Sequence, residues 1–383
     1  MGPAVMPEIL ELGTGVHLLV MGEEKMDEAT SLCLAGDTTD SVSHGRDDRD
    51  RVAPLYEAVD PDVDPIEANY EELELELDRE AELLWCNQRH LDRPSFTPKL
   101  LRDVQAFQQR VKAKYNGVQA PPFRYLAWAS QRPDVFNLGG DLPLICQLVA
   151  RRDRAGLLRY ARACIDICYQ NANKLDLPIV TIALCQSETL GGGFEAALSS
   201  DVIVAEERAR FGLPEVLFNL FPGMGAYSFL ARRIGVAAAE EMIFSGKVYT
   251  AAELKEMGVI DMVAPDGEGR HAVHAYIDRH RRHFTAHRAL YKVRRRFSPV
   301  SYQELTDIVT IWVDAALELD PLNLRKMERL ARSQERLNEK SVPYTPGRAA
   351  TAVDLREAEL LQCSKRSKRS DLMAQGRAGL ACH

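Results

Sequence analysis

Hydrophobic positions divide the chain into a polar beginning, an ordered middle and a polar end. Residues 37–64 are rich in Asp, Ser, Pro and Arg and contain almost no large apolar side chains. Such a stretch buries too little surface to offset its conformational entropy, so we predict that it is disordered. A short strand pair is expected before it, between Ile9 and Met21. An acidic docking sequence is the alternative for residues 37–64, but the composition favours a solvated linker.

From about residue 70 onwards, short apolar runs alternate with stretches of helical periodicity. Leucines at every second position from Leu73 to Leu77 indicate a half-buried strand. The continuous apolar run from Pro178 to Cys185 indicates a strand that is covered on both faces. Because strands and helices alternate, we predict an α/β fold. The other predicted strands are 81–87, 123–130, 202–205, 209–212 and 259–263.

Capping residues mark where the helices begin. The pair Thr97–Pro98 suits the first positions of a helix that ends before Gly117. Asp153 can cap a longer helix, and Thr250–Glu253 forms a capping box. Further helices are predicted over 191–200, where a turn leads into the helix, and over 224–234, 236–244 and 270–337, the last interrupted near residues 298–299.

The composition is that of an ordinary globular protein. Hydrophobic residues make up 46% and charged residues 27% of 383 positions. We predict no membrane span, because no run of eighteen apolar residues occurs. The beginning of the sequence has no secretory signal pattern, so we predict a cytoplasmic protein. The net charge of −8 argues against nucleic acid as a partner, although residues 279–296 and the end of the chain are basic.

The cysteines and histidines give no metal pattern. None of the eight cysteines forms a Cys-x-x-Cys pair, and most lie among apolar residues. Cys164 and Cys168 share a helix face, but that face has no histidine or carboxylate, so core packing is favoured. The histidines of residues 279–296 also lack a completing set of ligands. We therefore predict no metal site, and no disulfide framework.

Two glycine-rich segments follow predicted strands. Gly139 and Gly140 precede Asp141, and Gly191–Gly193 lies between a buried strand and a helix. Free amides in a first helical turn favour a developing negative charge. The amides of Gly140 and Gly192 are therefore candidate donors of an oxyanion hole, where one donor typically contributes about 3 kcal/mol. A nucleotide-binding turn is the alternative, but the dinucleotide fingerprint is absent.

Two glutamates stand in apolar surroundings, twenty residues apart. Glu195 is followed by Ala-Ala-Leu, and Glu215 lies within Leu-Pro-Glu-Val-Leu-Phe. Burial raises the pKa of a carboxyl group, and a second carboxylate nearby raises it further. Unequal protonation is what a general acid and a general base require. Alternatively, each glutamate caps a helix or pairs with Arg232 or Arg233.

Together these motifs resemble those of the crotonase (enoyl-CoA hydratase/isomerase) superfamily. Residues 139–142 are similar to its first oxyanion-hole motif and residues 191–195 to its second, and Glu195 and Glu215 match the glutamate pair of its hydratases. The resemblance implies a crotonase (ClpP/crotonase-like) fold, with a repeated ββα spiral core and a C-terminal helical trimerisation region. It divides the chain into an acidic, partly disordered extension (1–68), a crotonase core (69–270), a helical region (271–340) and a loose tail (341–383).

A closer resemblance is to the diffusible signal factor synthases of bacterial quorum sensing. It extends over about residues 70–337 and is carried by segments 135–142, 191–198, 212–229, 299–302 and 312–317. It implies an enzyme that dehydrates a 3-hydroxyacyl thioester on acyl carrier protein to a cis-2-enoyl thioester. The enzyme would then release the free unsaturated fatty acid by hydrolysis. The implied residues are catalytic Glu195 and Glu215, oxyanion-hole Gly140 and Gly192, and substrate-binding Gly139, Leu190, Gly191, Met224 and Trp312.

The resemblance also implies partners. They are acyl carrier protein or acyl-CoA, a regulatory protein, and further copies of the chain in a homotrimer or dimer of trimers. No cofactor is implied beyond the phosphopantetheine or coenzyme A of the substrate. The basic residues 279–296 are either a docking surface for such acidic groups or a solvated helix face.

Two other functions remain open. One is an enoyl-CoA hydratase of fatty-acid metabolism, and the other is a non-catalytic regulatory protein of the same fold. The presence of both glutamates argues against the second. Chain length, double-bond geometry and the division of roles between Glu195 and Glu215 are left open by the sequence.

Overall fold

The structure is a computed structural model that describes residues 9–12, 16–19, 53, 55, 56, 59, 60, 63–117 and 120–339. It divides the chain into two compact units, Met1–Asp48 and Arg49–His383. In the first unit, β1 (Ile9–Leu12) and β2 (Val16–Leu19) pair in antiparallel fashion, which confirms the predicted strand pair.

The polar segments at the two ends are described only in part. The predicted loose tail, 341–383, lies outside the described residues, as does most of the stretch predicted to be disordered, 37–64. Within that stretch, however, Tyr56 donates a hydrogen bond of 2.7 Å to the carbonyl oxygen of Pro98. The end of the acidic segment is therefore attached to the folded core. The proposed domain boundaries after residues 68, 270 and 340 stay predictions.

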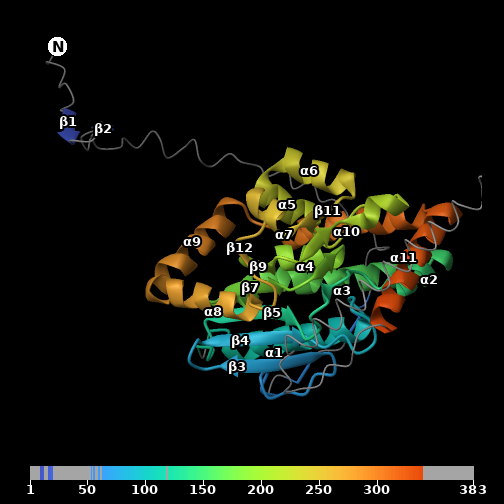
Figure 1. Ribbon diagram of the computed structural model, residues 1–383, viewed down its shortest axis with the longest axis horizontal. Coiled ribbons are helices and arrows are strands. Elements are labelled where there is room, and N and C mark those ends of the chain that lie inside the picture. The colour runs from blue at the N-terminus through green and yellow to red at the C-terminus, as the bar shows by residue number, and fades with distance from the viewer. Residues whose placement is uncertain are drawn as a thin grey trace, which may run out of the picture. The chain divides into compact units, whose positions relative to one another are not determined.

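Two β-sheets form the frame of the second unit (Figure 1). The large sheet is parallel except at its β3–β4 edge, and the small sheet is parallel except at its β10–β11 edge. In spatial order the large sheet contains β12 (Met262–Ala264), β9 (Val202–Glu206), β7 (Val180–Cys185), β5 (Tyr125–Ser130), β4 (Leu83–Gln88) and β3 (Leu73–Asp78). The small sheet contains β11 (Val248–Thr250), β10 (Arg210–Gly212), β8 (Glu188–Leu190) and β6 (Val135–Asn137).

A repeated strand–strand–helix unit builds both sheets. The large-sheet strands β5, β7 and β9 are each followed closely by a short strand of the small sheet, β6, β8 or β10. A helical segment comes next in each repeat. The chain therefore winds as the ββα spiral that the sequence resemblance implies.

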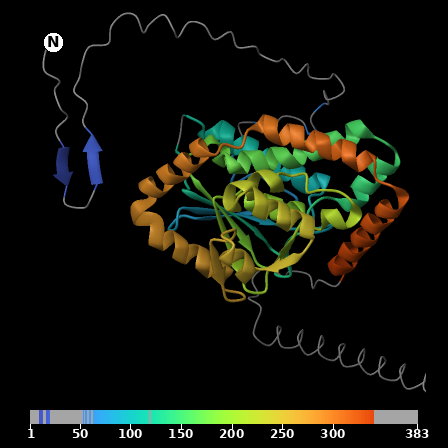
Figure 2. The ribbon, with the colours of Figure 1, turned by 90° about the horizontal axis from the view of Figure 1, so that it is seen from above.

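Helices cover both faces of the large sheet (Figures 1 and 2). On one face, α8 packs on Trp85, Tyr125 and Val204, while α1, α3 and α4 contribute to the larger core on the other face. In addition, α10 lies along α3, and α11 lies along α2. The helices are α1 (Pro98–Tyr115), α2 (Leu142–Ala150), α3 (Arg154–Ala172), η3 (Lys174–Asp176), α4 (Gly192–Leu198), η4 (Pro214–Phe218), α5 (Ala226–Ile234), α6 (Val236–Ser245), α7 (Ala251–Glu256), α8 (Gly269–His280), η5 (Arg281–His283), α9 (Phe284–Phe297), α10 (Tyr302–Leu317) and α11 (Pro321–Glu339).

The predicted caps and buried strands are confirmed. The side chain of Thr97 accepts a hydrogen bond of 3.2 Å from the Leu100 amide, and Thr250 with Glu253 forms the predicted capping box. Every residue of β7 is buried, as its continuous apolar run predicts. The last strand was predicted over 259–263, which is wrong by about three residues. The amide of Val259 instead bonds to the Leu254 carbonyl oxygen at 2.9 Å and closes the turn after α7.

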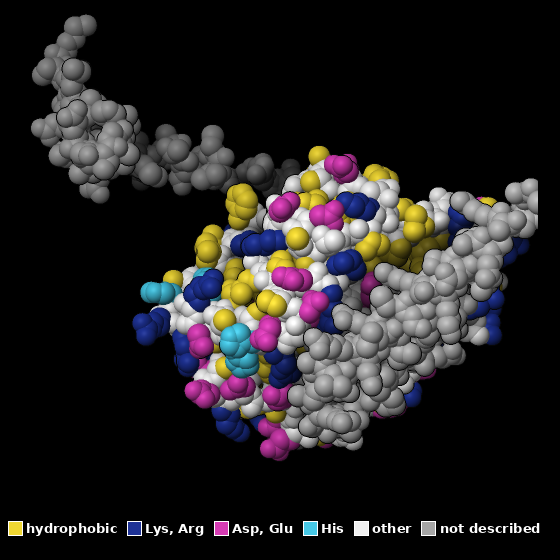
Figure 3. Space-filling model, in the orientation of Figure 1, with side chains coloured by type: hydrophobic (Ala, Val, Ile, Leu, Met, Phe, Trp, Pro, Cys, Tyr) yellow, Lys and Arg dark blue, Asp and Glu magenta, His cyan; other side chains and the backbone are white. Residues whose placement is uncertain are grey.

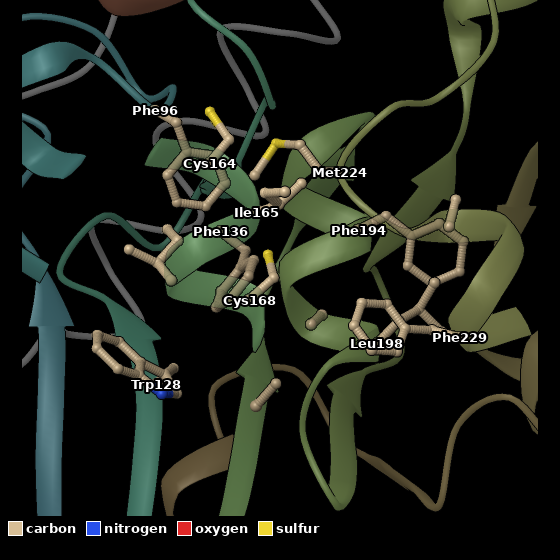
Figure 4. Packing of buried hydrophobic residues seen from close by; sticks show 14 of the residues in the cluster. Phe96, Trp128, Phe136, Cys164, Ile165, Cys168, Phe194, Leu198, Met224 and Phe229 are labelled. Atoms are coloured by element: carbon tan, nitrogen blue, oxygen red, sulfur yellow. The ribbon is translucent and has the colours of Figure 1, made fainter. Parts of the chain in front are cut away.

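Cysteines of α3 lie in the core, as predicted. Cys164 and Cys168 are each 1% exposed and pack among aromatic and aliphatic side chains, including Phe136 and Met224 (Figure 4). The cysteines that the structure describes are free thiols: Cys86, Cys146, Cys164, Cys168 and Cys185. Within the described ranges, no cluster of three or more His, Cys, Asp or Glu side chains is arranged to hold a metal ion. No helix in those ranges has the length and apolar character needed to cross a membrane.

Candidate active site

The two glycine-rich segments meet backbone to backbone. Gly139 has φ +94°, and a Cβ atom at this position would lie 2.6 Å from the amide nitrogen of Gly192. Gly191 has φ +50°, and a Cβ atom there would lie 2.6 Å from Oε1 of Glu215. Both the backbone conformation and the close approach therefore require glycine at these two positions.

The amides of Gly140 and Gly192 are the donors that the glycine motifs predict. Both residues line one cavity, and Gly192 is the first residue of α4, where an amide has no acceptor within the helix. A Cβ atom on Gly192 would lie 3.5 Å from the Gly140 nitrogen, so the two backbone segments are close together. No acceptor is recorded for either amide among the described residues. The pair can therefore donate to a substrate oxygen.

Side chains from two other elements hold the turn that contains Gly140. Asn137, at the end of β6, accepts a hydrogen bond of 2.8 Å from the Gly139 amide. On the other side of the turn, the Tyr160 hydroxyl of α3 accepts a hydrogen bond of 2.7 Å from the Asp141 amide. The Gly140 amide is thus fixed between two hydrogen-bonded neighbours.

Glu195 is held in the cavity by the backbone of the segment that enters α5. Its Oε1 atom accepts hydrogen bonds from the amides of Met224, at 2.7 Å, and Ala226, at 2.9 Å. The side chain is nearly inaccessible to solvent, and this burial raises the pKa of Glu195, while the amide donors act in the opposite direction.

Glu215 lies in η4 and lacks comparable donors. Its Oε2 atom is buried and has no hydrogen-bond partner in the described part of the chain. Burial raises the pKa of Glu215, and the nearby charge of Glu195 raises it further. Burial and mutual repulsion therefore disfavour ionisation of both carboxyl groups at once and favour a state in which the pair keeps one proton. That proton is more stable on Glu215, because only the Glu195 carboxylate is stabilised by two backbone amides.

Neither glutamate pairs with the arginines that follow Glu215. Arg232 pairs with Glu304 at 2.8 Å, and Arg233 lies 3.6 Å from Asp261. The alternative of a simple ion pair with Arg232 or Arg233, which the sequence left open, is therefore wrong for both glutamates.

The cavity is small and largely apolar. Its volume of about 60 Å³ is room for a few water molecules. Trp312 forms part of the wall and packs on Gly223, where a Cβ atom would lie 2.5 Å from the indole ring. The lining residues are Gly140, Leu142, Ile145, Tyr160, Ala161, Cys164, Gly192, Glu195, Glu215, Phe218, Leu220, Gly223, Met224, Val309, Trp312 and Met327.

The structure brings most of the predicted site residues together. Gly140, Gly192, Glu195, Glu215, Met224 and Trp312 all line this cavity. Gly139 and Gly191 lie directly behind the lining, where their backbone approaches Gly192 and Glu215. Leu190 is not among the lining residues, and its side chain approaches Gly212 of the neighbouring strand β10.

Sequence reasoning missed the part of the wall that comes from distant helices. Tyr160 and Cys164 come from α3, and Met327 comes from α11. A tyrosine on the apolar face of a helix was one available signal, because a buried tyrosine hydroxyl needs a hydrogen-bond partner. Cys164 and Met327 have no pattern that distinguishes them from other core residues.

The site therefore combines a strand–strand–helix spiral with two glycine amides that lie beside two glutamates in one apolar cavity. The family model described as enoyl-CoA hydratase/isomerase matches residues 122–296. The chain is 33% identical, over 202 residues, to the enoyl-CoA isomerase/hydratase fer4 of Mycosarcoma maydis, which covers 50% of this chain and 69% of that protein. The chain belongs to the enoyl-CoA hydratase/isomerase family.

Other similarities agree with this assignment. A 2,3-dehydroadipyl-CoA hydratase of Escherichia coli is 37% identical over 130 residues, which cover 34% of this chain and 48% of that protein. Two solved structures share the fold. One is an enoyl-CoA hydratase of Bacillus halodurans, with a TM-score of 0.57 and 18% identity over 68% of this chain. The other is the human mitochondrial delta3-delta2-enoyl-CoA isomerase, with a TM-score of 0.57 and 20% identity over 71% of this chain. Both are covered along their whole length (100%), which confirms the predicted crotonase fold.

Proposed function

We propose that the protein dehydrates a 3-hydroxyacyl thioester on acyl carrier protein and hydrolyses the resulting cis-2-enoyl thioester to a free cis-2-unsaturated fatty acid. One observation supports this proposal: the buried Glu195 and the half-buried Glu215, whose Oε2 atom is itself buried, line an apolar cavity next to two free backbone amides. The sequence resemblance to diffusible signal factor synthases gives the substrate and the second step. The family assignment supports acyl-thioester chemistry in general.

In the first step the thioester oxygen would accept hydrogen bonds from the amides of Gly140 and Gly192. These donors stabilise the enolate that forms when the α-proton leaves. One carboxylate takes that proton, and the other carboxyl group gives its proton to the hydroxyl on the β-carbon, which departs as water. A pair that carries one proton has both the acid and the base that this elimination requires.

In the second step water would attack the carbonyl carbon of the enoyl thioester. A glutamate carboxylate takes a proton from the water, and the same two amides hold the oxyanion of the tetrahedral intermediate. The carbon–sulfur bond then breaks, and the phosphopantetheine sulfur leaves with the proton. The products are the free acid and the thiol form of the carrier protein.

The apolar wall favours a fatty acyl chain as the substrate group. Met224, Trp312 and Met327 face the cavity together with several aliphatic residues. Because methionine side chains adapt easily to new shapes, Met224 and Met327 are suited to move aside when an acyl chain enters.

A plain enoyl-CoA hydratase is the second candidate. It uses the same glutamate pair in the opposite direction, and the relative from Escherichia coli is named as a hydratase of a CoA thioester. The two candidates differ in the carrier, coenzyme A or acyl carrier protein, and in the release of a free acid. For either enzyme we retain a cytoplasmic location and no nucleic-acid partner as part of the proposal.

A homotrimer or a dimer of trimers is also proposed. Apolar side chains are exposed on α9 and α6, where Phe297 is 89% and Phe244 is 76% exposed, and Figure 3 shows apolar side chains over both helices. Leu290 and Val293, each 61% exposed, continue the same face of α9 as Phe297. An apolar surface of this kind favours contact with another protein chain. Light scattering after size-exclusion chromatography tests this, with the mass of a trimer or a hexamer expected for the native chain and a smaller mass for Phe297→Glu.

Mass spectrometry of the fatty acids released from 3-hydroxydodecanoyl acyl carrier protein tests the proposed reaction. We expect a free 2-enoic acid with the native protein and none with Glu195→Gln. The matched control is Glu256→Gln, which changes an exposed glutamate at the end of α7 and should leave the product unchanged. Enoyl thioester without free acid would contradict the hydrolytic step.

The same assay separates the remaining candidates. Faster turnover of the coenzyme A thioester, without free acid, would identify the enoyl-CoA hydratase. No product from either carrier would favour the non-catalytic protein. Comparing circular dichroism spectra of the variants establishes that a loss of product is not a loss of folding.

A further inference from the structure

A second cavity lies at the other end of α4 from the glycine amides. It has a volume of about 130 Å³ and shares no lining residue with the glutamate cavity. Leu198, the last residue of α4, and Phe229 of α5 contribute an apolar wall, and the two lie side by side in Figure 4. Four arginines line the remainder, two from α5 and two from α9: Arg232, Arg233, Arg294 and Arg295.

Three of these arginines have partners within the protein. Arg232 pairs with Glu304 at 2.8 Å. Arg233 donates a hydrogen bond of 2.6 Å to the carbonyl oxygen of Ser200. Arg294 pairs with Asp201 at 3.0 Å.

Arg295 differs from the other three. It is only partly exposed, yet it makes no hydrogen bond and no ion pair with the residues that the structure describes. Burial lowers the pKa of Arg295; the charges of Asp201 and Asp176 oppose this decrease only in part, and the positive charge of Arg294 adds to it. The free energy of this guanidinium would fall if an anion entered the cavity.

The charges around the cavity do not balance. Asp201 is shared between Arg294 and the buried Lys174, whose Nζ lies 2.7 Å from the carboxylate. Asp176 also attracts Arg295 but pairs with Lys112 at 2.7 Å. Six cationic side chains therefore meet four carboxylates, those of Asp176, Asp201, Asp261 and Glu304. The cavity keeps an excess of two positive charges, which a doubly charged anion would compensate.

We propose that this cavity binds a phosphate group, either as inorganic phosphate or as the end of a small phosphate monoester. A phosphate carries nearly two negative charges at neutral pH, and guanidinium groups match its oxygens with paired hydrogen bonds. The Ser298 hydroxyl, which also lines the cavity, has no recorded partner among the described residues and is available as a further donor.

Helix α5 connects the phosphate cavity with the active site. Its first residue, Ala226, donates to Glu195, and its last turn carries Arg232 and Arg233. A phosphate would also join α5 to α9, which has no fully buried residue of its own. Occupancy is therefore expected to stabilise the folded chain and to stiffen the helix that holds Glu195. This inference does not depend on the substrate proposed above.

Isothermal titration calorimetry of the full chain with sodium phosphate tests the site. We expect saturable binding of one phosphate per chain for the native protein and for Arg296→Gln, whose side chain is exposed and outside the lining. Arg295→Gln should weaken binding at least tenfold. Unfolding temperatures in phosphate and in sodium chloride of equal ionic strength provide a second measurement, in which only phosphate raises the unfolding temperature of the native protein.

A parallel titration with phenyl phosphate distinguishes the two sources of the phosphate. Tighter binding of phenyl phosphate would indicate a monoester whose body contacts Leu198 and Phe229. Tighter binding of inorganic phosphate would indicate the free ion. No saturable heat with either compound, or equal affinity in the native protein and Arg295→Gln, would overturn the proposal.

Discussion

The amide of Ala226 donates a hydrogen bond of 2.9 Å to Oε1 of Glu195. The acidic side chain of one helix, α4, is thus held by the first residue of another, α5, and the Met224 amide contacts the same oxygen at 2.7 Å. Because both donors belong to the backbone, they will hold any acceptor that stands at position 195 in the same place. A glutamine there keeps an oxygen for both amides but cannot exchange the proton.

Glu195→Gln and Glu215→Gln should therefore remove catalysis without removing the fold. We expect kcat to fall by at least about 100-fold for each, the usual contribution of a general acid or base. Steady-state kinetics with an acyl-thioester substrate checks this, and far-ultraviolet circular dichroism checks the fold. Activity within a factor of three of the native protein in both variants would contradict the assignment of the catalytic pair.

The pH profile of activity should be bell-shaped, with its acidic limb at a higher pH than an ordinary carboxylate gives. Burial raises the pKa of Glu195 and of Glu215, and the mutual charge adds to the increase for Glu215. At pH values below the optimum both carboxyl groups are protonated, so no base remains. At pH values above the optimum both are ionised, so no acid remains. A plot of kcat/KM against pH between 4 and 10 measures the two limbs. An acidic limb near pH 4 would show that the pair is not desolvated.

The same shifts predict how stability depends on pH. A carboxyl group whose pKa is raised on folding stabilises the folded chain fully at pH values below its pKa in the unfolded chain, which is 4.5 for Glu215. This stabilisation is lost as the pH rises through the pKa of the folded chain. Glu215→Gln removes this loss because an amide does not ionise. Its melting temperature should exceed that of the native protein at pH 9 by at least about 3 °C, the change that about 1 kcal/mol produces in a domain of this size, and the difference should vanish near pH 4. Differential scanning calorimetry at both pH values checks this, with Glu256→Gln showing no such pH-dependent gain.

Gly191→Ala should impair catalysis by displacing Glu215. The added Cβ atom would lie 2.6 Å from the Oε1 atom of that glutamate, and the positive φ adds backbone strain. We expect at least a tenfold decrease in kcat. The control is Gly117→Ala, which also has a positive φ but whose added Cβ atom would have no atom of the described residues within 4 Å. Equal kinetics in the two variants would show that the contact with Glu215 is unimportant.

Tyr160→Phe should act on the oxyanion donors without touching the glutamates. The Tyr160 hydroxyl joins the Asp141 amide, at 2.7 Å, to the Phe96 carbonyl oxygen, at 2.9 Å, and its loss leaves buried polar groups unpaired at a cost of about 1–3 kcal/mol. The Gly140 amide then loses its fixed direction, so kcat should fall about tenfold with a smaller change in KM. Tyr227→Phe, which removes an exposed hydroxyl, is the control. A change in KM alone would indicate a role in binding and not in positioning.

Much of the fold could be predicted because several elements carry local signals. Thr97 with Pro98 predicts the start of α1, and the continuous apolar run of β7 predicts a buried strand, each from neighbouring residues alone. Sequence reasoning missed the strands β6, β8 and β11 but predicted β10, which is equally short. Three residues are too few to show a period reliably, and the pairing of such strands depends on distant partners. Helix α2 was missed because its apolar residues do not leave a clear polar face.

The same distinction applies to the site. Glycine and glutamate motifs identify the cavity residues of α4 and η4, because close backbone approach and a buried carboxylate restrict residue type strongly. Tyr160 and Met327 could not be assigned in this way, since they reach the cavity only through the packing of α3 and α11. Leu190 shows the opposite case. It stands next to the glycine motif, yet it contacts its cross-strand neighbour Gly212 and does not line the cavity.

The contact of Gly139 with the Gly192 amide has a consequence for how such an enzyme can diverge. The two catalytic amides are positioned by main chain against main chain, with no bulky side chain between them. Substitutions at Glu195, Glu215 or Trp312 can therefore change the proton transfer or the acyl specificity while the oxyanion hole, which holds the thioester oxygen, stays intact. A lineage that keeps these glycines can exchange one reaction for another in single steps, each from a protein that still binds its thioester.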